Sequence, residues 1–85
     1  MEIIKTDDFN RVFKKLPRKI QSFYKNQEER FQNNWRDSRL HVKKLRLLSL
    51  AFSFRITRNY RVLFYFQNST TAVFFEVDNR KDIYR

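Results

Sequence analysis

The spacing of apolar residues predicts two consecutive helices in the first half of the chain. One helix face is marked by apolar residues three and four positions apart: Phe9, Val12, Phe13 and Leu16. Thr6, followed by two aspartates, supplies an N-cap ahead of this face. Pro17 fits the first turn of a second helix, whose apolar residues keep a rough helical phase up to Trp35. We therefore expect one helix to end near Leu16 and a second to begin there, with almost no linker.

The hydrophobic period changes from helical to two residues at Leu48, which is typical of strands. Apolar side chains then alternate with small or polar ones through a first strand: Leu48, Leu50, Phe52, Phe54 and Ile56. Tyr60–Gln67 is apolar on both sides, as in a strand covered on both faces, and Thr71–Asp78 is a third strand. Glu2–Lys5 alternates weakly and predicts a short strand at the start. The pattern predicts a single α+β domain over residues 1–85, with two N-terminal helices packed on a small twisted antiparallel β-sheet.

The first turn of this sheet decides which residues face each other, because side chains alternate across a strand. A three-residue loop at 57–59 keeps the apolar faces of both strands together and sets Arg55 opposite Arg61. Such a loop needs a residue with positive φ. We assign that conformation to Asn59, because the chain has no glycine and asparagine tolerates it best.

The second turn is predicted at Asn68 and Ser69, as a two-residue turn that sets Glu76 opposite Arg61. The sheet face expected to hold the helices is then continuous and apolar, with Leu50, Phe52, Phe54, Val62, Phe64, Phe66, Val73, Phe75 and Val77. The opposite face gathers Arg55, Arg61 and Glu76 at one end.

Two arginines directly opposed on a sheet destabilise it unless an anion lies between them. An exposed ion pair of Arg61 with Glu76 contributes at most about 1 kcal/mol. A phosphate group, in contrast, is gripped in bidentate fashion by planar guanidinium groups. Residue spacing alone leaves both interpretations open.

Positive charge is concentrated in the middle of the chain, which carries a net charge of +10. Residues 36–61 contain eight basic residues and one acid, Asp37, so this stretch alone carries +7. Such density favours a polyanionic partner, nucleic acid or an acidic protein, over a basic surface that only keeps the protein in solution. Arg58, at the tip of the first turn, is expected to matter least for chemistry, and His41 to make an ordinary surface or loop hydrogen bond.

Several kinds of site are excluded by residues that the chain lacks. It has no cysteine and no glycine, which excludes disulfides, thiol nucleophiles and the usual glycine-rich nucleotide loops. Only His41 and the carboxylates are suited to binding a metal, so no zinc site is expected. We expect no metal, no cofactor and no membrane contact, because no apolar run approaches about 18 residues and no signal-peptide pattern opens the chain. A cytoplasmic protein is therefore predicted.

Four segments of the sequence resemble the RelE/ParE superfamily of bacterial toxins from toxin–antitoxin pairs. They are VFKKLPRKIQ at 12–21, LHVKKL at 40–45, SFRITRNYRVLF at 53–64 and VDNRKDIYR at 77–85. The second half is the more specific, with an arginine-bearing strand, a turn, Tyr-Arg-Val and a C-terminal Arg…Tyr ending. Its SFRIT…YRV spacing is also similar to the YoeB branch. The resemblance covers nearly the whole chain and implies the RelE-like α+β fold.

The resemblance implies two alternative functions. RelE-type members cut mRNA in the ribosomal A site and so inhibit translation, whereas ParE-type members inhibit DNA gyrase and are not nucleases. Members of both types are neutralised by an antitoxin protein. The partners implied are therefore a cognate antitoxin together with mRNA and the ribosome, or with DNA gyrase.

The resemblance also implies roles for single residues in RNA cleavage, in which a 2′-hydroxyl attacks the adjacent phosphate. Arg61 and Arg80 match the two arginines of the family and would stabilise the phosphorane, and Tyr84 matches the tyrosine that orients the 2′-hydroxyl or stacks on a base. Arg55 would hold a neighbouring phosphate. The basic residues expected to approach the RNA backbone are Lys43, Lys44 and Arg46.

Two departures from the family pattern concern proton transfer. Many relatives have Gly-His where this chain has Asp78-Asn79, and the Asn79 side chain cannot act as a general acid. A YoeB-like glutamate base is also missing, and Glu76 is its candidate substitute by the predicted pairing alone. Arg61, Arg80 and Tyr84 favour a ribosome-dependent endoribonuclease. The missing histidine and glutamate favour a gyrase inhibitor or a catalytically weak RNA-binding relative.

Overall fold

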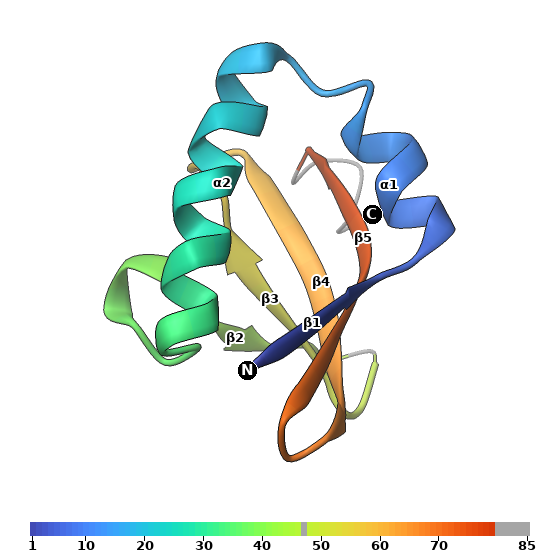
Figure 1. Cartoon of the computed structure of the whole chain (residues 1–85), viewed down its shortest axis with the longest axis vertical. Coiled ribbons are helices and arrows are strands. Elements are labelled where there is room, and N and C mark those ends of the chain that lie inside the picture. Colours follow the sequence, from blue (N-terminus) through green and yellow to red (C-terminus); the bar gives the residue numbers. More distant parts are fainter. Residues whose placement is uncertain (47, 80–85) are drawn as a thin grey trace.

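The computed structural model describes residues 1–46 and 48–79, except for the side chain of Asp78. In this part of the chain, two α-helices cover one face of a five-stranded sheet with the strand order β1-β5-β4-β3-β2 (Figure 1). The elements follow one another as β1 (Glu2–Lys5), α1 (Asp7–Phe13), α2 (Arg18–Asn33), a short 3₁₀ helix η1 (Ser38–Leu40), β2 (Lys43–Lys44), β3 (Ala51–Arg55), β4 (Tyr60–Asn68) and β5 (Thr71–Asn79).

The two helices begin where the sequence predicts. The side chain of Thr6 caps α1, since its Oγ1 accepts a hydrogen bond of 3.1 Å from the backbone N–H of Phe9. Helix α1 ends at Phe13, before Leu16, whose side chain is nevertheless buried in the turn that follows. Pro17 is the N-cap of α2 rather than its first helical residue. Its φ of −54° suits a helix start, and proline has no N–H to leave unsatisfied there.

Helix α2 is fixed on the sheet by a cluster of buried aromatic rings. Phe31 of α2 has no exposed surface, and its ring lies 4.9 Å from that of Phe64 and 5.0 Å from that of Phe74, in edge-on geometry. Phe54 completes the cluster at 5.4 Å. These rings come from three adjacent strands, so one side chain of α2 ties β3, β4 and β5 together. Edge-on pairs of this kind add about 0.5–1.5 kcal/mol each beyond the area that they bury.

The sheet is mixed, whereas the sequence predicted an antiparallel one. Strands β3, β4 and β5 form the expected antiparallel meander, and β2 joins β3 at one edge. At the other edge β1 runs parallel to β5, with Glu2 opposite Thr71 and Lys5 opposite Phe74 (Figure 1). The strand at Glu2–Lys5 was predicted, but four residues of weak alternation carry no information on their pairing partner or direction.

The predicted register between β3 and β4 is confirmed. Arg55 lies opposite Arg61, and Phe54 opposite Val62. The backbone N–H of Ile56 donates to the Tyr60 carbonyl at 2.8 Å and closes the loop 57–59. The assignment of a left-handed conformation to Asn59 is wrong, because positive φ occurs among the described residues only at His41 and Leu50.

The predicted register between β4 and β5 is wrong. The turn is made by Ser69 and Thr70, because the side chain of Asn68 accepts hydrogen bonds from the backbone N–H and hydroxyl of Thr70 at 2.9 and 3.0 Å. Two irregularities follow along the strands: the one between Phe66 and Asn68 shifts the pairing by one residue, and the one between Leu63 and Phe64 shifts it back. Arg61 consequently lies opposite Asp78 and not opposite Glu76.

The shifted register also exchanges the two faces of β5 along most of its length. Ala72 and Phe74 are fully buried on the helix side, where Val73 and Phe75 were expected. The Phe75 ring instead contacts Tyr65, a residue exposed on the other side of the sheet, at 5.8 Å. Val77 keeps its predicted place in the core, because the extra residue at the bulge restores the phase before it.

Leu48 and Leu50 lie outside the strand that they were expected to open. Strand β3 begins at Ala51, whose backbone carbonyl accepts a 2.9 Å hydrogen bond from the Leu45 N–H, and this bond closes the β2–β3 connection. Leu50 is 77% exposed and has a φ of 75°. The two-residue apolar period in the sequence therefore begins before the strand itself begins.

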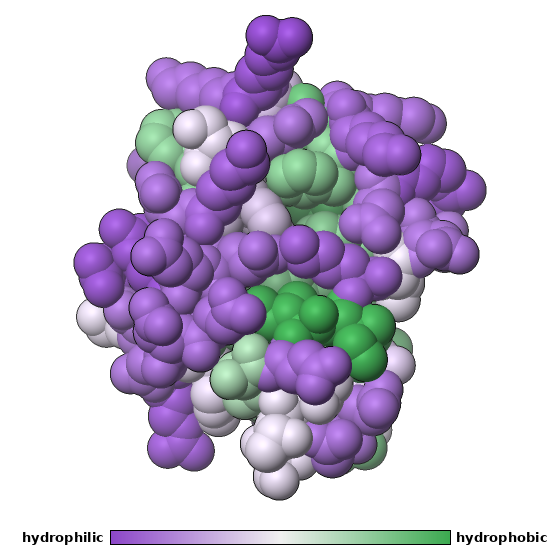
Figure 2. Space-filling model, in the orientation of Figure 1, coloured by the Kyte–Doolittle hydropathy of each residue, from purple (hydrophilic) through white to green (hydrophobic). Residues whose placement is uncertain are grey.

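Hydrophilic side chains cover most of the face shown in Figure 2, and an apolar patch interrupts them where Figure 1 has β1. Ile4 of β1 is 39% exposed. None of the described helices is long and apolar enough to cross a membrane.

Candidate functional site

Arg55, Arg61 and Asp78 occupy facing positions in three adjacent strands. Arg55 ends β3 and lies opposite Arg61 of β4, which in turn lies opposite Asp78 of β5. Glu76 lies opposite Leu63 and is exposed, so its predicted pairing with Arg61 does not exist. The facing arginines were predicted from the first turn. The acidic position beside them was assigned to the wrong residue, because the second turn lies at Ser69 and Thr70 and not at Asn68 and Ser69.

Arg61 is almost completely buried, with 2% of its surface exposed. Its neighbours on this face of the sheet, Ser53 and Leu63, are buried as well. A guanidinium group stays charged at any ordinary pH, and its attraction to an anion is stronger in surroundings of low dielectric constant than in water. Arg61 is therefore a fixed positive charge inside the sheet rather than a mobile surface charge.

Arg55 combines an anchored backbone with an available side chain. Its carbonyl oxygen accepts a 2.7 Å hydrogen bond from Gln27, which holds the end of β3 against α2. Its Nε atom is buried and has no hydrogen-bond partner among the described residues. A buried donor without a partner costs free energy, and an anionic ligand would relieve that cost.

Gln27 joins three elements at this end of the sheet. Its side chain is buried in α2, and both amide hydrogens are used, one on the Arg39 carbonyl at 3.0 Å and one on the Arg55 carbonyl. Its oxygen accepts from Arg30 at 2.8 Å. Sequence reasoning missed this residue. The available signal was its spacing, since Tyr24, Gln27 and Phe31 share one helix face, and a polar residue on a buried face needs partners.

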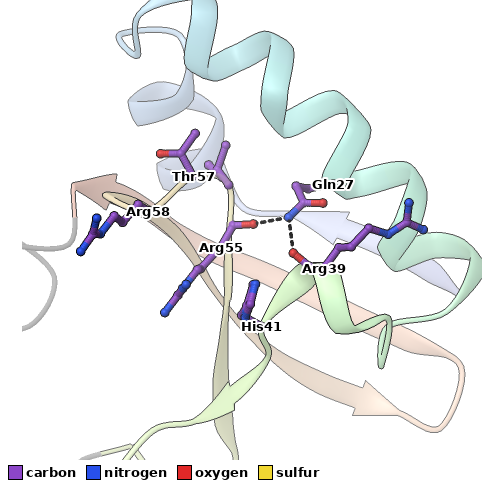
Figure 3. Close-up of a pocket in the computed structure, with 7 residues that line it drawn as sticks. Gln27, Arg39, His41, Arg55, Thr57 and Arg58 are labelled. Atoms are coloured by element: carbon purple, nitrogen blue, oxygen red, sulfur yellow. Dashed lines mark hydrogen bonds between the residues drawn. The ribbon is translucent and has the colours of Figure 1, made fainter.

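A pocket of about 540 Å³ lies where α2, η1 and the β3–β4 turn meet (Figure 3). Among the described residues, those that line the pocket are mostly polar and include none with a carboxylate: Gln27, Arg39, His41, Arg55, Ile56, Thr57 and Arg58. Figure 3 shows the guanidinium groups of Arg55 and Arg58 directed to the same side, with His41 beside Arg55. The structure thus brings Arg58 and His41, of which little was expected, next to Arg55.

Arg39 differs from the other two arginines of the pocket because its charge is already paired. In Figure 3 its guanidinium extends away from those of Arg55 and Arg58. It binds the Asp37 carboxylate through two nitrogens, at 2.7 and 3.0 Å. These bonds, with one from the Arg39 backbone N–H, lower the pKa of Asp37 to about 2. The positive charge left to the pocket therefore comes from Arg55 and Arg58.

The basic residues around β2 are divided between the two faces of the sheet. Lys43 lies opposite Ser53 and so shares the face of Arg55 and Arg61. Lys44 lies opposite Phe52, which packs against Trp35 on the helix side. Both lysines and Arg46 are exposed. Of the three, only Lys43 has a strand position on the arginine face.

Three predicted residues lie at or beyond the end of β5. Asn79 is half-buried and pairs with Tyr60. Arg80 and Tyr84 lie outside the described residues, so their predicted roles stay predictions. No group of three side chains suited to binding a metal lies together within residues 1–46 and 48–79.

Solved structures of toxins share this fold and part of this sequence. A RelB–RelE antitoxin–toxin complex from Methanococcus jannaschii matches with a TM-score of 0.78 and 28% identity, over 95% of this chain and 94% of that one. The toxin–antitoxin complex RelBE2 from Mycobacterium tuberculosis matches with a TM-score of 0.68 and 31% identity, over 93% and 96% of the two chains. The chain belongs to the RelE/ParE toxin superfamily. The resemblance noted in the sequence is thereby confirmed, as is the RelE-like α+β fold.

Another solved structure shares the fold at much lower identity. YafQ from Escherichia coli strain BL21(DE3) matches with a TM-score of 0.81 over 99% of this chain and 98% of that one, at 9% identity. No protein-family model matches the chain, and neither does any curated protein. The RelE/ParE fold thus tolerates almost complete replacement of its sequence.

Proposed function

We propose that this RelE/ParE protein is the toxin of a type II toxin–antitoxin pair and cleaves mRNA on the ribosome. The observation that carries the proposal is the pair of facing arginines, Arg55 and Arg61, of which Arg61 is 98% buried. A sheet that sets two guanidinium groups opposite each other gains stability from an anion between them. A polyphosphate backbone supplies such an anion, and the net charge of +10 attracts it.

The proposed reaction is attack of a ribose 2′-hydroxyl on the adjacent phosphorus. The 2′-oxygen loses its proton and forms a new bond to phosphorus, and the bond to the 5′-oxygen breaks. A 2′,3′-cyclic phosphate remains on the upstream fragment, and the 5′-oxygen takes up a proton to become the 5′-hydroxyl of the downstream fragment. Negative charge builds on the phosphorane, and Arg61 stabilises it from a buried, preorganised position. Arg80 adds a second positive charge in this proposal, and Tyr84 orients the 2′-hydroxyl.

Acid–base catalysis is the weaker part of the proposed mechanism. Asn79 replaces the usual histidine and cannot transfer a proton, and Glu76 does not lie beside Arg61. We therefore assign most of the rate enhancement to charge stabilisation and positioning, with Tyr84 as the remaining proton-transfer group. A correctly placed general acid contributes about 10²–10⁴-fold, so the expected turnover is slower than that of relatives with histidine.

A cognate antitoxin is the proposed protein partner. Three of the similar solved structures are toxin–antitoxin complexes: two of RelE with RelB, and RelBE2. An acidic antitoxin would be attracted to the basic surface around Lys43, Lys44 and Arg46 and would compete there with RNA.

Inhibition of DNA gyrase is the second candidate function. The feature that favours it is the absence of both family proton-transfer residues, since a gyrase inhibitor needs neither. The two functions leave different products in the cell, because one acts on mRNA and the other on DNA topology.

The deciding experiment maps mRNA 5′ ends after brief induction of the gene. The nuclease proposal expects new ends inside translated regions, arrest of growth, and loss of both in Arg61→Gln, which keeps much of the buried volume. Exposed Arg18 provides the control, since Arg18→Ala should cut and arrest like the unaltered protein. Far-UV circular dichroism confirms that each variant folds. Intact mRNA together with DNA damage would refute the nuclease and support the gyrase reading.

A further inference from the structure

The pocket at the β3–β4 turn contains more hydrogen-bond donors than residues 1–46 and 48–79 use. Both amide hydrogens of Gln27 donate to backbone carbonyls, and the Arg39 guanidinium is bound to Asp37. The donors left are the guanidinium groups of Arg55 and Arg58, the hydroxyl of Thr57 and the ring of His41. Gln27 and Arg39 thus form the frame of the pocket, and the other polar residues are available to a ligand.

The available groups call for an anion. Neither Arg55 nor Arg58 forms an ion pair with any described carboxylate. The two arginines lie three residues apart at the end of β3 and in the turn that follows, and Figure 3 shows both directed to one side. Two like charges on neighbouring side chains repel each other. An oxyanion bound between both guanidinium groups would offset this repulsion.

The size of the pocket narrows the class of anion. Its volume of about 540 Å³ falls within the range of sites for small organic ligands, about 300–1,000 Å³, and is larger than a lone phosphate requires. His41 offers a flat ring beside Arg55, suited to stacking against a base. An acidic peptide side chain would engage one guanidinium group and leave this ring and the Thr57 hydroxyl unused.

We propose that this pocket binds one nucleotide of RNA, the neighbour of the nucleotide cleaved at Arg61. Arg58 and Arg55 hold its phosphate, Thr57 donates to a phosphate oxygen, and His41 stacks on its base. Arg55 takes part in both sites, because it lies opposite Arg61 and also lines the pocket. The inference rests on the proposed nuclease function, and it makes the β3–β4 turn the element that sets the register of RNA across the sheet.

The test titrates the protein with a short single-stranded oligonucleotide that cannot be cleaved and follows the NMR signals of the pocket. The probe is a trinucleotide with 2′-deoxyribose at each position, which cannot be cleaved by 2′-hydroxyl attack; inorganic phosphate is the second probe. The proposal expects shifts in the Nε–H signals of Arg55 and Arg58 and in the ring of His41. Arg58→Ala should weaken trinucleotide binding about tenfold and Arg58→Lys less, while Arg11→Ala, at an exposed arginine of α1, should bind normally.

The salt dependence provides an independent measure. Each phosphate contact with a single strand contributes about 0.7 to the slope of log K against log salt, so Arg58→Ala should lower the slope by about that amount. An unchanged slope and affinity in Arg58→Ala would overturn the inference. So would shifts produced by an acidic peptide and not by the trinucleotide.

The experiments distinguish failure of the nucleotide-site proposal from failure of the nuclease proposal. Arg61→Gln should still bind the trinucleotide through the pocket while losing cleavage. Absence of cleavage by the unaltered protein, combined with Arg58-dependent binding, would refute the nuclease and retain the nucleotide site. Cleavage that proceeds with equal affinity and equal sequence position in Arg58→Ala would refute the nucleotide site and retain the nuclease.

Discussion

Leu50 has a backbone conformation that a leucine seldom adopts, and its side chain gains little from it. Its φ is 75°, and 77% of its surface is exposed. The left-handed region costs an L-residue about 1–2 kcal/mol, a cost that glycine avoids. His41, at φ 49° and ψ 51° after η1, shares the conformation, but histidine is among the residues that tolerate it better. Because the chain has no glycine, two residues that pay a conformational energy for positive φ, Leu50 and His41, adopt it here.

We predict that Leu50→Gly stabilises the protein. Relief of strain exceeds the backbone entropy that glycine loses on folding, about 0.5–1 kcal/mol, so the free energy of unfolding should rise by up to about 1 kcal/mol. Urea denaturation measures it. Leu48 is the matched control, because it is also exposed and has no positive φ, so Leu48→Gly should destabilise. A loss in Leu50→Gly as large as that in Leu48→Gly would contradict the prediction.

At the scale of elements, Gln27 is the connection that holds the arginine end of the sheet. It fixes two backbone carbonyls, those of Arg39 and Arg55, which are 12 and 28 residues away along the chain. Sequence patterns report local periodicity, so contacts of this kind cannot be read from them. The facing of Arg55 and Arg61 could be predicted, because a three-residue loop and side-chain alternation determine it. Which side chains of β5 face the helices could not be predicted, because this depends on a turn formed by the Asn68 side chain and on two bulges.

We predict that Gln27→Ala destabilises the protein by about 2–4 kcal/mol. Two partly buried carbonyls lose their donor, at about 1–3 kcal/mol each as an upper bound, and packing is lost as well. Chemical denaturation gives the difference, with exposed Gln32→Ala on the same helix as the control. Hydrogen exchange should also accelerate at Ile56 and Leu40 more than at Val62. A stability equal to that of Gln32→Ala would show that water replaces the amide without cost.

At the scale of the whole molecule, side chains link the edge strand β1 to α2. Lys5 of β1 and Glu28 of α2 form an ion pair at 2.6 Å, and Glu28 also accepts a 2.6 Å hydrogen bond from the buried Tyr24 hydroxyl. The parallel addition of β1 to β5 was not predictable, since its support comes from this contact and from the Glu2 N–H bond to the Thr70 carbonyl. Burial and the neighbouring Glu28 carboxylate raise the pKa of Tyr24.

We predict a loss of stability at high pH that depends on Tyr24. Folding keeps this hydroxyl neutral, whereas in the unfolded chain it ionises near the ordinary tyrosine pKa of 10.0. The stabilising contribution is therefore complete below pH 10 and declines above it, by up to about 1.4 kcal/mol per pH unit. Unfolding at pH 9 and pH 11 should differ more for the unaltered protein than for Tyr24→Phe. Equal differences in the two proteins would contradict the prediction.

The bulge between Leu63 and Phe64 has a consequence for how this fold can vary. It gives β5 a different pairing register with β4 on each side. In one register Phe74 packs in the aromatic core, and in the other Asp78 lies opposite Arg61. A one-residue insertion or deletion within β5 can be absorbed by moving the bulge, while the core half of the strand keeps its alignment. The arginine end can thus change its opposing residue while Phe74 keeps its place opposite Phe64 in the core. Substitutions at the arginine end of β5 and in its core half can therefore accumulate independently of each other.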